Sequence, residues 1–382
     1  MISESSEYPY WIAFTQIQGM RIAKKNDLIV RWTLGQMSII DFFHSEKAKL
    51  QNLFSLNTNE IAKIDVAKSE IPNYSFLAED LLNQGYNITP ITSTDYPATM
   101  KENLKENYAP PLIYTKGNKQ ITKEKSIAIV GSRTASDVSL GFTDNIAKKA
   151  SRDYKVVVSG FAKGVDKQAL DSAIKYTGQS IIVLPQGIST FKSGFKKYYK
   201  QIIEGDVLVL STFYPKAPWS VPLAMARNPI IYGLANEIYV AESGDKGGTW
   251  SGVIDGLRKG RGIFVRVPGE NEKNANKALI QKGAVPVDSE GEKVINYSQK
   301  IRQTVLVNEP VPDFETIDQK IEKLLLSGSY TSLEIINRLK LDWTPRKLTV
   351  YLKQKNNIVV ISQKSPVKFS LQNHENGQQS LF

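Results

Sequence analysis

Short apolar runs alternate with amphipathic stretches through the middle of this chain. Each amphipathic stretch, such as the one near Leu140–Ser151, has the period of a helix. Apolar runs that alternate with helices predict strands buried on both faces of a parallel sheet. The sequence therefore predicts an α/β core. Its strands are expected at Ile127–Val130, Val156–Val158, Ser180–Leu184, Val207–Leu210, Ile238–Ala241 and Ile263–Val267.

Helical patterns come before this core. Within residues 8–65, Trp11 and Phe14 share an apolar face, and a second helix is expected near Leu34–His44, with Ser38 capping part of it. The turn at Gly19 precedes basic residues and allows two interpretations, a DNA-binding helix-hairpin-helix or a structural helical bundle. The bundle is favoured because the Gly-x-Gly turn of the DNA-binding module is absent.

Residues 74–118 connect these helices to the core. A helix is expected at Phe76–Gln84, where Gly85 ends it, and a short strand at Tyr86–Ile91. Paired prolines at 110 and 111 and the pair Gly117-Asn118 then predict an edge strand bounded by turns. Later in the core, a proline-containing loop is expected to precede a helix at Ala226–Leu234.

Three helices and two strands are expected near the carboxyl end. Thr344 at the N-cap and Pro345 at the first helical position mark the start of the third helix, Arg346–Lys355. This helix carries Arg346, Lys347, Lys353 and Lys355, which suit contact with DNA, but few amides, which favours a protein-interaction module instead. The other elements are expected at Asp318–Leu326, Ser332–Leu339, Ile358–Ser362 and Val367–Leu371, and together they predict a winged helix.

The chain therefore has several expected domains. They are a helical domain at 1–70 (resembling a SAM or helix-hairpin-helix domain), the α/β core at 71–290, a proline-containing linker at 291–316, the winged helix at 317–372 and a flexible tail at 373–382. The tail contains Gln378, Leu381 and Phe382 in the order Gln-Gln-Ser-Leu-Phe, which resembles the peptide that binds the bacterial sliding clamp. Chance is the alternative for so short a pattern.

Composition excludes several kinds of site. The 382 residues include no cysteine and only two histidines, His44 and His374, so thiolate zinc sites, a thiol nucleophile and histidine-based metal clusters or triads are not expected. No cofactor is expected. No signal peptide or membrane-spanning run is visible, so we expect a cytoplasmic protein without a membrane partner. The net charge of +11 suits a polyanionic partner, although basic residues also serve solubility.

Small or basic residues follow most of the predicted strands. The carboxyl ends of parallel strands meet at one edge of the sheet, where the helix amino ends present N–H groups to anions. None of the turns has the spacing of a standard nucleotide-binding loop. The sequence therefore predicts a phosphate-binding edge without such a loop. Its candidate residues are Gly131, Ser132, Arg133, Ser159, Gly160, Lys163, Gly164, Asp166, Arg227, Asn228, Gly247, Gly248 and Thr249.

A basic loop with aromatic residues adds a further candidate. Lys192, Lys196 and Lys197 lie among Phe191, Phe195, Tyr198 and Tyr199. Such a segment suits single-stranded nucleic acid, because lysines meet phosphates and rings stack on bases. An amphipathic helix with its aromatic side chains in the core explains the same pattern, and both interpretations stay open.

Several of these segments together resemble the DprA/Smf family of bacterial DNA-processing proteins. The resemblance covers about Asp95 to Gly269 and the predicted winged helix. It implies an extended Rossmann-like core that binds single-stranded DNA without sequence preference, forms a homodimer and loads RecA recombinase. It also assigns Arg133, Ser159, Lys163, Asp166 and Arg227 to the binding pocket. The matching segments are Asp-Tyr-Pro at 95–97, Pro-Pro-Leu-Ile-Tyr-Thr-Lys-Gly-Asn at 110–118, Gly-Ser-Arg at 131–133, Ser-Gly-Phe-Ala-Lys-Gly-Val-Asp at 159–166, Arg-Asn at 227–228 and Pro-Gly at 268–269.

The chain departs from the family pattern at four places. The Tyr-Pro pair that the family has after its third strand is missing. Ser211-Thr212 stands where the family has Ser-Glu, and Pro229 stands where the family has the last arginine of Arg-Asn-Arg. Gly247-Gly248-Thr249 replaces Ser-Gly-Ser-Leu and is similar to a turn of lysine-decarboxylase-like nucleotide-binding proteins. From the phosphate-binding edge and the family resemblance, we expect a DNA-binding mediator rather than an enzyme. The alternative is a nucleotide-binding sensor or nucleotide-processing enzyme, for example in phage defence. In that case Asp166 or Glu242 acts as an acid, a base or a ribose ligand. For Asp166, helix capping is the simpler role.

Overall fold

The computed structural model describes residues 4–295, 297, 317–341, 343–353, 355, 358–361 and 367–371. The chain divides into two compact units, Met1–Lys300 and Ile301–Phe382, and each is described by itself. The tail residues Gln378, Leu381 and Phe382 lie outside the described residues, as does most of the predicted linker. The clamp-binding hypothesis therefore stays a prediction.

The described part of the first unit is built on a nine-stranded sheet with the order β1-β2-β6-β5-β4-β3-β7-β8-β9. The strands from β6 to β9 in this order are all parallel, and β1 and β2 add an antiparallel pair at one end. The mixed α/β prediction with a mostly parallel sheet is confirmed. The strands are β1 (Asn87–Pro90), β2 (Leu112–Lys116), β3 (Ser126–Val130), β4 (Val156–Ser159), β5 (Ser180–Val183), β6 (Val207–Ser211), β7 (Glu237–Val240), β8 (Ile263–Arg266) and β9 (Val285–Val287).

Helices cover both faces of this sheet, and β3 shows how its sequence serves both. Ile127 and Ile129 pack with α8 (Asp137–Arg152) and α9 (Val165–Lys175) in one apolar cluster. Ala128 and Val130 belong to the other cluster, with residues of α12 (Val221–Leu234) and α13 (Gly248–Arg258). Because successive side chains of a strand point to opposite faces, a continuous apolar run fills both layers.

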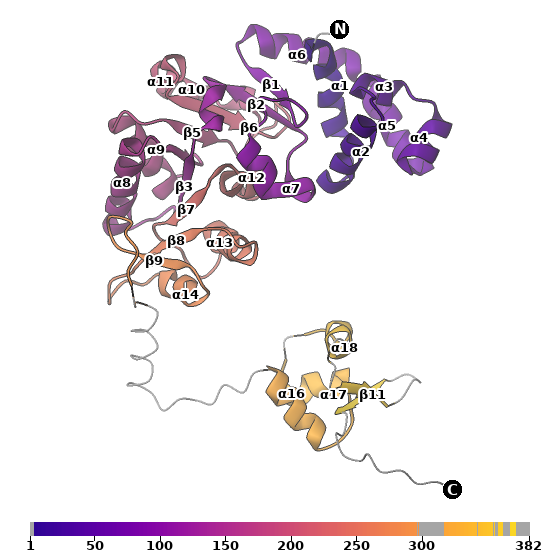
Figure 1. The fold of residues 1–382 in the computed structure, drawn as a ribbon, viewed down its shortest axis with the longest axis vertical. Coiled ribbons are helices and arrows are strands. Elements are labelled where there is room, and N and C mark those ends of the chain that lie inside the picture. Colours follow the sequence, from indigo (N-terminus) through magenta and orange to yellow (C-terminus); the bar gives the residue numbers. More distant parts are fainter. Residues whose placement is uncertain are drawn as a thin grey trace. The chain divides into compact units, whose positions relative to one another are not determined.

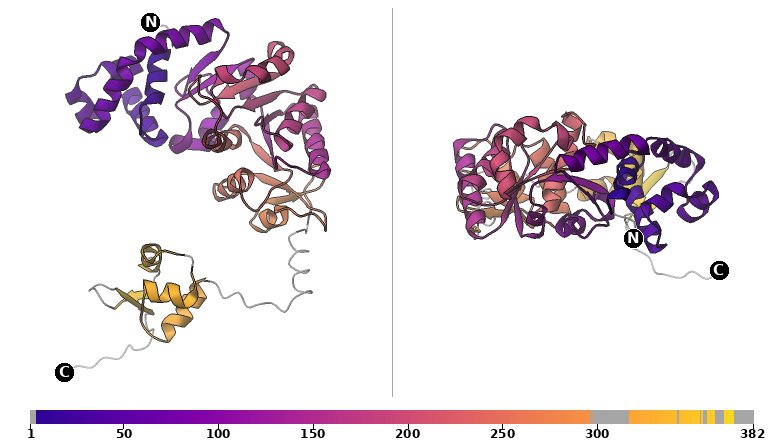
Figure 2. Two further views of the ribbon diagram at one scale, coloured as in Figure 1. Left: turned by 180° about the vertical axis from the view of Figure 1, so that it is seen from behind. Right: turned by 90° about the horizontal axis from the view of Figure 1, so that it is seen from above.

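Six helices gather at the β1 end of the sheet, while α13 and α14 (Asn276–Gln281) lie toward the β9 end (Figure 1 and Figure 2). Edge-to-face contacts among Trp11, Phe14, Trp32 and Phe42 fill the core of this helical part. Ser38 accepts a hydrogen bond from the Asp41 backbone N–H at 3.1 Å, which confirms its capping role. The helices are α1 (Glu4–Gln16), α2 (Ile22–Leu34), α3 (Ile39–His44), α4 (Lys47–Phe54), α5 (Thr58–Ser69) and α6 (Ile71–Asn83).

Several local predictions were wrong. The predicted helix Leu34–His44 is the end of α2 followed by α3, because Ser38 starts a new helix. The predicted edge strand, β2, lies between β1 and β6, so the flanking prolines bound an interior strand. Helix α12 begins at Val221 rather than near Arg227, because Pro222 occupies its first turn, where a missing N–H costs nothing. The sequence interpretation also missed α7 (Ala98–Tyr108), α14 and β9.

The second unit has its own small core. Helices α16 (Ile317–Leu326), α17 (Ser332–Leu339) and α18 (Pro345–Lys353) pack with a three-stranded antiparallel sheet in the order β10-β12-β11. Thr344 accepts a hydrogen bond from the Lys347 N–H, so the predicted start of the third helix is confirmed. The strands are β10 (Tyr330–Thr331), β11 (Ile358–Val360) and β12 (Lys368–Leu371), and the buried core is Ile321, Leu325, Ile335, Leu348, Leu352 and Phe369.

Candidate nucleic-acid interface

A cleft of about 440 Å³ opens at the carboxyl ends of β3 and β7. The chain leaves β3 toward β4 on one side, whereas β7 lies on its other side, so strand order reverses at this point. Ligands of open parallel sheets bind at such reversals, because the two connections diverge and leave a crevice. The candidate residues that line the cleft are Gly131, Ser132, Arg133, Asp166, Arg227, Asn228, Gly247, Gly248 and Thr249.

Three turns interlock around this cleft. Gly131 lies so close to the second turn that a β-carbon there would meet Val165 Cγ2 at 2.5 Å. Gly164 has a φ of +77°, and a β-carbon there would lie 2.3 Å from the Ser132 carbonyl oxygen. The Thr249 hydroxyl donates to the Gly131 carbonyl oxygen at 3.1 Å, which ties in the third turn. The glycines therefore allow close packing of the turns as well as access to the cleft.

Asp166 and Arg227 form a buried ion pair in the wall of the cleft. Their nearest charged atoms, Asp166 Oδ2 and Arg227 Nη1, are 3.7 Å apart, and Arg227 is only 4% exposed. Burial raises the pKa of Asp166, and the charges of Arg227 and Arg133 oppose that rise. Asp166 also accepts hydrogen bonds from the backbone N–H groups of Gly160 and Ala162. It therefore holds the second turn in place.

Asp166 does not have the helix-capping role considered from the sequence. The N-cap of α9 is Gly164, which has no side chain to accept a hydrogen bond. Gly247 stands in the same position before α13. No side chain caps either helix, so both first turns carry a positive end of the helix dipole without a capping oxygen. Both helix starts lie beside the cleft, where they favour an anion.

Two exposed cations line the cleft. Arg133 follows β3, and Lys246 precedes α13. Among the described residues, neither side chain forms an ion pair, so both charges are available to a ligand. Lys246 was assigned no role from the sequence, although it immediately precedes the turn Gly247-Gly248-Thr249. Lys163 is exposed next to Ala162, which lines the cleft, but is not itself in the lining.

Other predicted residues support the cleft from beneath. Ser159 is fully buried, and its hydroxyl donates to the Ile129 carbonyl oxygen at 2.8 Å. Gly160 lies against Arg227, because a β-carbon at 160 would be 1.5 Å from Arg227 Nη1. Arg227 itself donates to the Val183 carbonyl oxygen at 3.2 Å. Ser159, Gly160 and Arg227 therefore shape the site through packing rather than through open contact.

Glu242 is also committed to the structure. Its Oε2 accepts hydrogen bonds from the Ser136 N–H at 3.0 Å, the Ser136 hydroxyl at 2.7 Å and the Ser139 hydroxyl at 2.8 Å. Burial alone would raise the pKa of Glu242, but these hydrogen bonds lower it overall. A carboxylate held in this way anchors the start of α8 and is a poor general acid.

A second charge pair, between buried Arg266 and half-buried Glu272, continues this network. The Arg266 guanidinium donates to the Ser139 hydroxyl oxygen at 2.9 Å. It also forms a bidentate salt bridge with the Glu272 carboxylate, at 2.9 Å to Oε1 and 2.5 Å to Oε2. These hydrogen bonds from Arg266 hold the pKa of Glu272 at about 2. Arg266 is 3% exposed. The carboxyl end of β8 is therefore fixed by a charge pair that depends on an ionised Glu272.

We expect this pair to make stability depend on pH. The folded pKa of Glu272 lies below its unfolded value, so its contribution is complete above about pH 4.5 and lost as pH falls toward 2. The contribution is roughly 3 kcal/mol, since the pKa falls from 4.5 to about 2 and one pKa unit corresponds to about 1.4 kcal/mol. Urea unfolding across this range should show a steeper loss in the wild type than in Glu272→Gln. Parallel curves for the two proteins would contradict the assignment.

The aromatic rings of the 191–199 segment mostly face the core. Phe191 and Tyr198 are buried, and Phe195 packs against Phe191 and Tyr86. The residues form two short helices, α10 (Lys192–Lys197) and α11 (Tyr199–Glu204). This arrangement favours the amphipathic-helix interpretation for these three rings, whereas Tyr199 is exposed.

The lysines of this segment lie apart from the cleft. Lys192 and Lys196 are exposed, and Lys197 pairs with Asp171 at 3.0 Å. None of the three, nor Phe195, lines the cleft. A different aromatic residue lies near the cleft. Trp219 is 52% exposed and stands two residues before Val221, which lines the cleft. Trp219, which lies in the proline-containing loop between β6 and α12, was assigned no role from the sequence.

Comparison with known proteins gives this fold a family. The family model for DNA recombination-mediator protein A matches residues 87–298, more than half of the chain. The chain belongs to this family. DNA processing protein DprA of Streptococcus pneumoniae is 33% identical over 193 residues, which cover 49% of this chain and 67% of that protein. The Bacillus subtilis DprA is 30% identical over 209 residues, covering 53% and 68%.

A solved structure agrees with the fold of this recombination-mediator family member. The X-ray structure of the Streptococcus pneumoniae DprA superposes with a TM-score of 0.62 at 23% identity and covers 79% of this chain and 98% of that one. The resemblance to the DprA/Smf family inferred from the sequence is confirmed. Among the described residues, no helix is both long and apolar enough to cross a membrane.

Proposed function

We propose that this protein binds single-stranded DNA as a recombination mediator, with DNA phosphates in the cleft at the ends of β3 and β7. The proposal rests mainly on one observation. Arg133 and Lys246 line the same cleft as the first turns of α9 and α13, which no side chain caps. Cations and helix amino ends both favour phosphate. Membership of a DNA recombination-mediator family supports a DNA ligand.

The two carboxylates near the cleft already have partners within the protein, which favours a binding role over a catalytic one. Asp166 is paired with Arg227, and Glu242 accepts three hydrogen bonds from Ser136 and Ser139. Neither is poised as a free acid or base. Other predicted residues remain proposed contributors to DNA binding. Ser159 would act by holding the sheet edge in place, and the lysines would act through charge on the neighbouring surface; these lysines are Lys163, Lys192, Lys196 and Lys197.

Further features of the family are proposals for this chain. They are an extended Rossmann-like core with a separate helical domain at 1–70, a homodimer and the loading of RecA recombinase. The three helices and small sheet of the second unit support a winged helix, for which we favour a protein-interaction role. A sliding-clamp contact through Gln378, Leu381 and Phe382 is proposed from the sequence alone.

A nucleotide-binding sensor is the second candidate. The cleft volume of about 440 Å³ lies in the range of small-ligand sites, and the turn Gly247-Gly248-Thr249 lines it. A mononucleotide would use the same cations and helix ends. The two functions differ in the length of ligand that binds and in the number of phosphates contacted.

Binding of labelled oligothymidine by fluorescence anisotropy, beside a screen of mononucleotides, separates these functions. We expect tight oligonucleotide binding that weakens steeply with salt, because each contacted phosphate of a single strand contributes about −0.7 to the slope of log K against log [salt]. Mononucleotides should compete weakly. Tight binding of one mononucleotide, with little binding of the oligonucleotide, would instead establish the sensor.

A further inference from the structure

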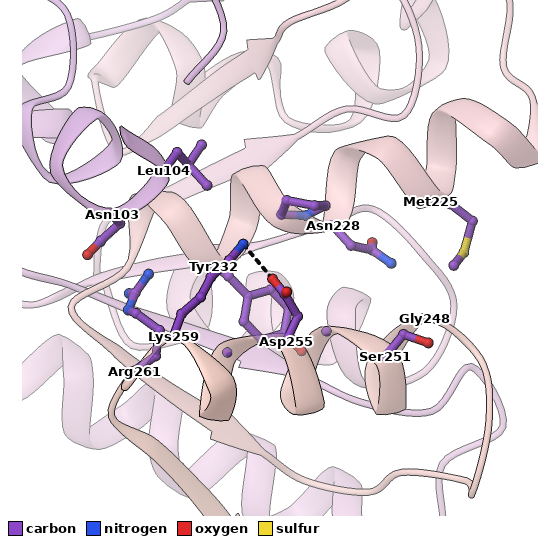
Figure 3. Close-up of a pocket in the computed structure, with 13 residues that line it drawn as sticks. Asn103, Leu104, Met225, Asn228, Tyr232, Gly248, Ser251, Asp255, Lys259 and Arg261 are labelled. Atoms are coloured by element: carbon purple, nitrogen blue, oxygen red, sulfur yellow. Dashed lines mark ion pairs between the residues drawn. The ribbon is translucent and has the colours of Figure 1, made fainter. Parts of the chain in front are cut away.

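A second, smaller pocket adjoins the cleft between α7, α12 and α13 (Figure 3). Its volume is about 150 Å³. Met225, Asn228, Tyr232 and Gly248 line both this pocket and the cleft, so the two spaces are continuous along one wall. Figure 3 shows Asn228 and Tyr232 on α12 facing α13, with Ser251 and Asp255 on the opposite side.

The pocket exists because α13 has glycines on the face toward α12. Gly248 and Gly252 are four residues apart and share this side of the helix, whereas a β-carbon at Gly256 would meet Ile263 of β8. A β-carbon at 248 would lie 2.6 Å from the Asn228 amide nitrogen, and one at 252 would lie 2.8 Å from the Tyr232 hydroxyl oxygen. Larger residues would push these polar side chains away from the space between the helices.

Three polar groups at the pocket lack partners. Tyr232 is 7% exposed, and its hydroxyl has no hydrogen bond in the structure. Within the described part of the chain, the side chains of Asn228 and Ser251 also form none. Of the three, Tyr232 is buried, Asn228 is half-buried and Ser251 is exposed. A buried hydroxyl without a partner is costly, so a site that keeps Tyr232 in this state suits a ligand that supplies a hydrogen bond.

The charge of the pocket differs from that of the cleft. Asp255 lines it, and Lys259 pairs with this carboxylate at 2.7 Å. Arg261 also lines the pocket and donates to the Ala235 carbonyl oxygen. Both lining cations therefore already have partners within the protein, and the Asp255 carboxylate disfavours a phosphate. An amide, a hydroxyl and a mostly apolar wall instead suit a neutral, planar ring with hydrogen-bonding edges.

We propose that this pocket holds one pyrimidine base of the DNA strand whose phosphates lie in the cleft. A cavity of about 150 Å³ accommodates one benzene-sized ring, so a six-membered pyrimidine fits better than a two-ring purine. Asn228 has both a donor and an acceptor, which match the hydrogen-bonding edge of thymine or cytosine. This inference rests on the proposed function and adds a base preference to it.

The test compares oligothymidine, oligocytidine, oligoadenosine and an abasic oligonucleotide, each of about 12 nucleotides. Wild-type protein should bind the two pyrimidine strands at least about threefold more tightly than oligoadenosine, because modest pyrimidine preferences are typical of single-strand binding. Ser251→Phe places a ring in the pocket from an exposed position. It should abolish the preference while leaving the affinity for the abasic strand unchanged.

Ser75→Phe is the matched control, because it adds the same ring at an exposed helical serine on α6. It should keep the wild-type preference. Equal affinity of the wild type for all three bases, or a preference that survives Ser251→Phe, would overturn the inference. Loss of abasic binding in the wild type would instead count against the phosphate cleft, so the two failures are distinguishable.

Discussion

Arg227→Met is expected to lower the free energy of unfolding by about 3–5 kcal/mol near neutral pH, because it leaves a buried carboxylate without its counter-charge. Asp166 and Arg227 are both buried, and their charged atoms are 3.7 Å apart. The hydrogen bond from Arg227 to the Val183 carbonyl oxygen is lost as well. Urea unfolding of the full chain, followed by circular dichroism, measures the change.

The loss should depend on pH in a defined direction. Burial already raises the pKa of Asp166, and removal of Arg227 removes the largest opposing charge, so the folded pKa rises further. A raised folded pKa gives stability that is complete below the unfolded pKa and lost as pH rises through the folded value. Arg227→Met should therefore be less destabilising at about pH 4.5 than at neutral pH.

Two further variants check this explanation. Asp166→Asn combined with Arg227→Met should recover part of the loss, because no charge then remains buried without a partner. Arg258→Met, at an exposed position of α13, should change stability by no more than about 0.5 kcal/mol. A double variant as unstable as Arg227→Met alone would show that the ion pair is not the source of the effect.

Removing both exposed cations of the cleft should weaken DNA binding at low salt by roughly 100-fold. A hydrogen bond to a charged group is worth about 1.5–3 kcal/mol, which is about tenfold or more for each cation. Arg133→Ala with Lys246→Ala should also reduce the salt slope by about 1.4, since two phosphate contacts of a single strand are lost. The loss should be similar for all base sequences, because phosphates carry no sequence information.

The matched control removes the same charge from elsewhere. Lys49→Ala with Lys282→Ala takes away two exposed lysines that do not line the cleft. It should leave affinity and salt slope close to those of the wild type. If this control weakened binding as much as the cleft variant does, net charge rather than a defined site would account for the binding.

Much of the fold was predictable because local patterns decide it. Each of the six predicted core strands matches a strand of the sheet within about one residue at either end, since a continuous apolar run has few alternatives in a parallel sheet. The missed elements have weaker signals. Helix α7 is polar and irregular, with Lys105 at a φ of +54°, and β9 has only three residues.

The candidate site was less predictable, because side-chain burial depends on contacts distant in sequence. The strand-end turns indicated the right edge of the sheet, and many of their residues line the cleft. The sequence did not distinguish exposed Arg133 from buried Arg227, since both are arginines beside small or polar residues. It also suggested stacking by Phe195, which packs against Phe191 and Tyr86, and gave no role to Lys246 or Trp219.

The sequence by itself determined the six core strands, the small-residue turns and the family resemblance, because hydrophobic period and turn chemistry are local properties. The tertiary structure alone decided which charges face the cleft and which are buried. Arg227 reaches Asp166 across 61 positions of the chain because α12 packs on the sheet beside β4. The glycines of α13 likewise became a pocket wall only when that helix met Tyr232 of α12.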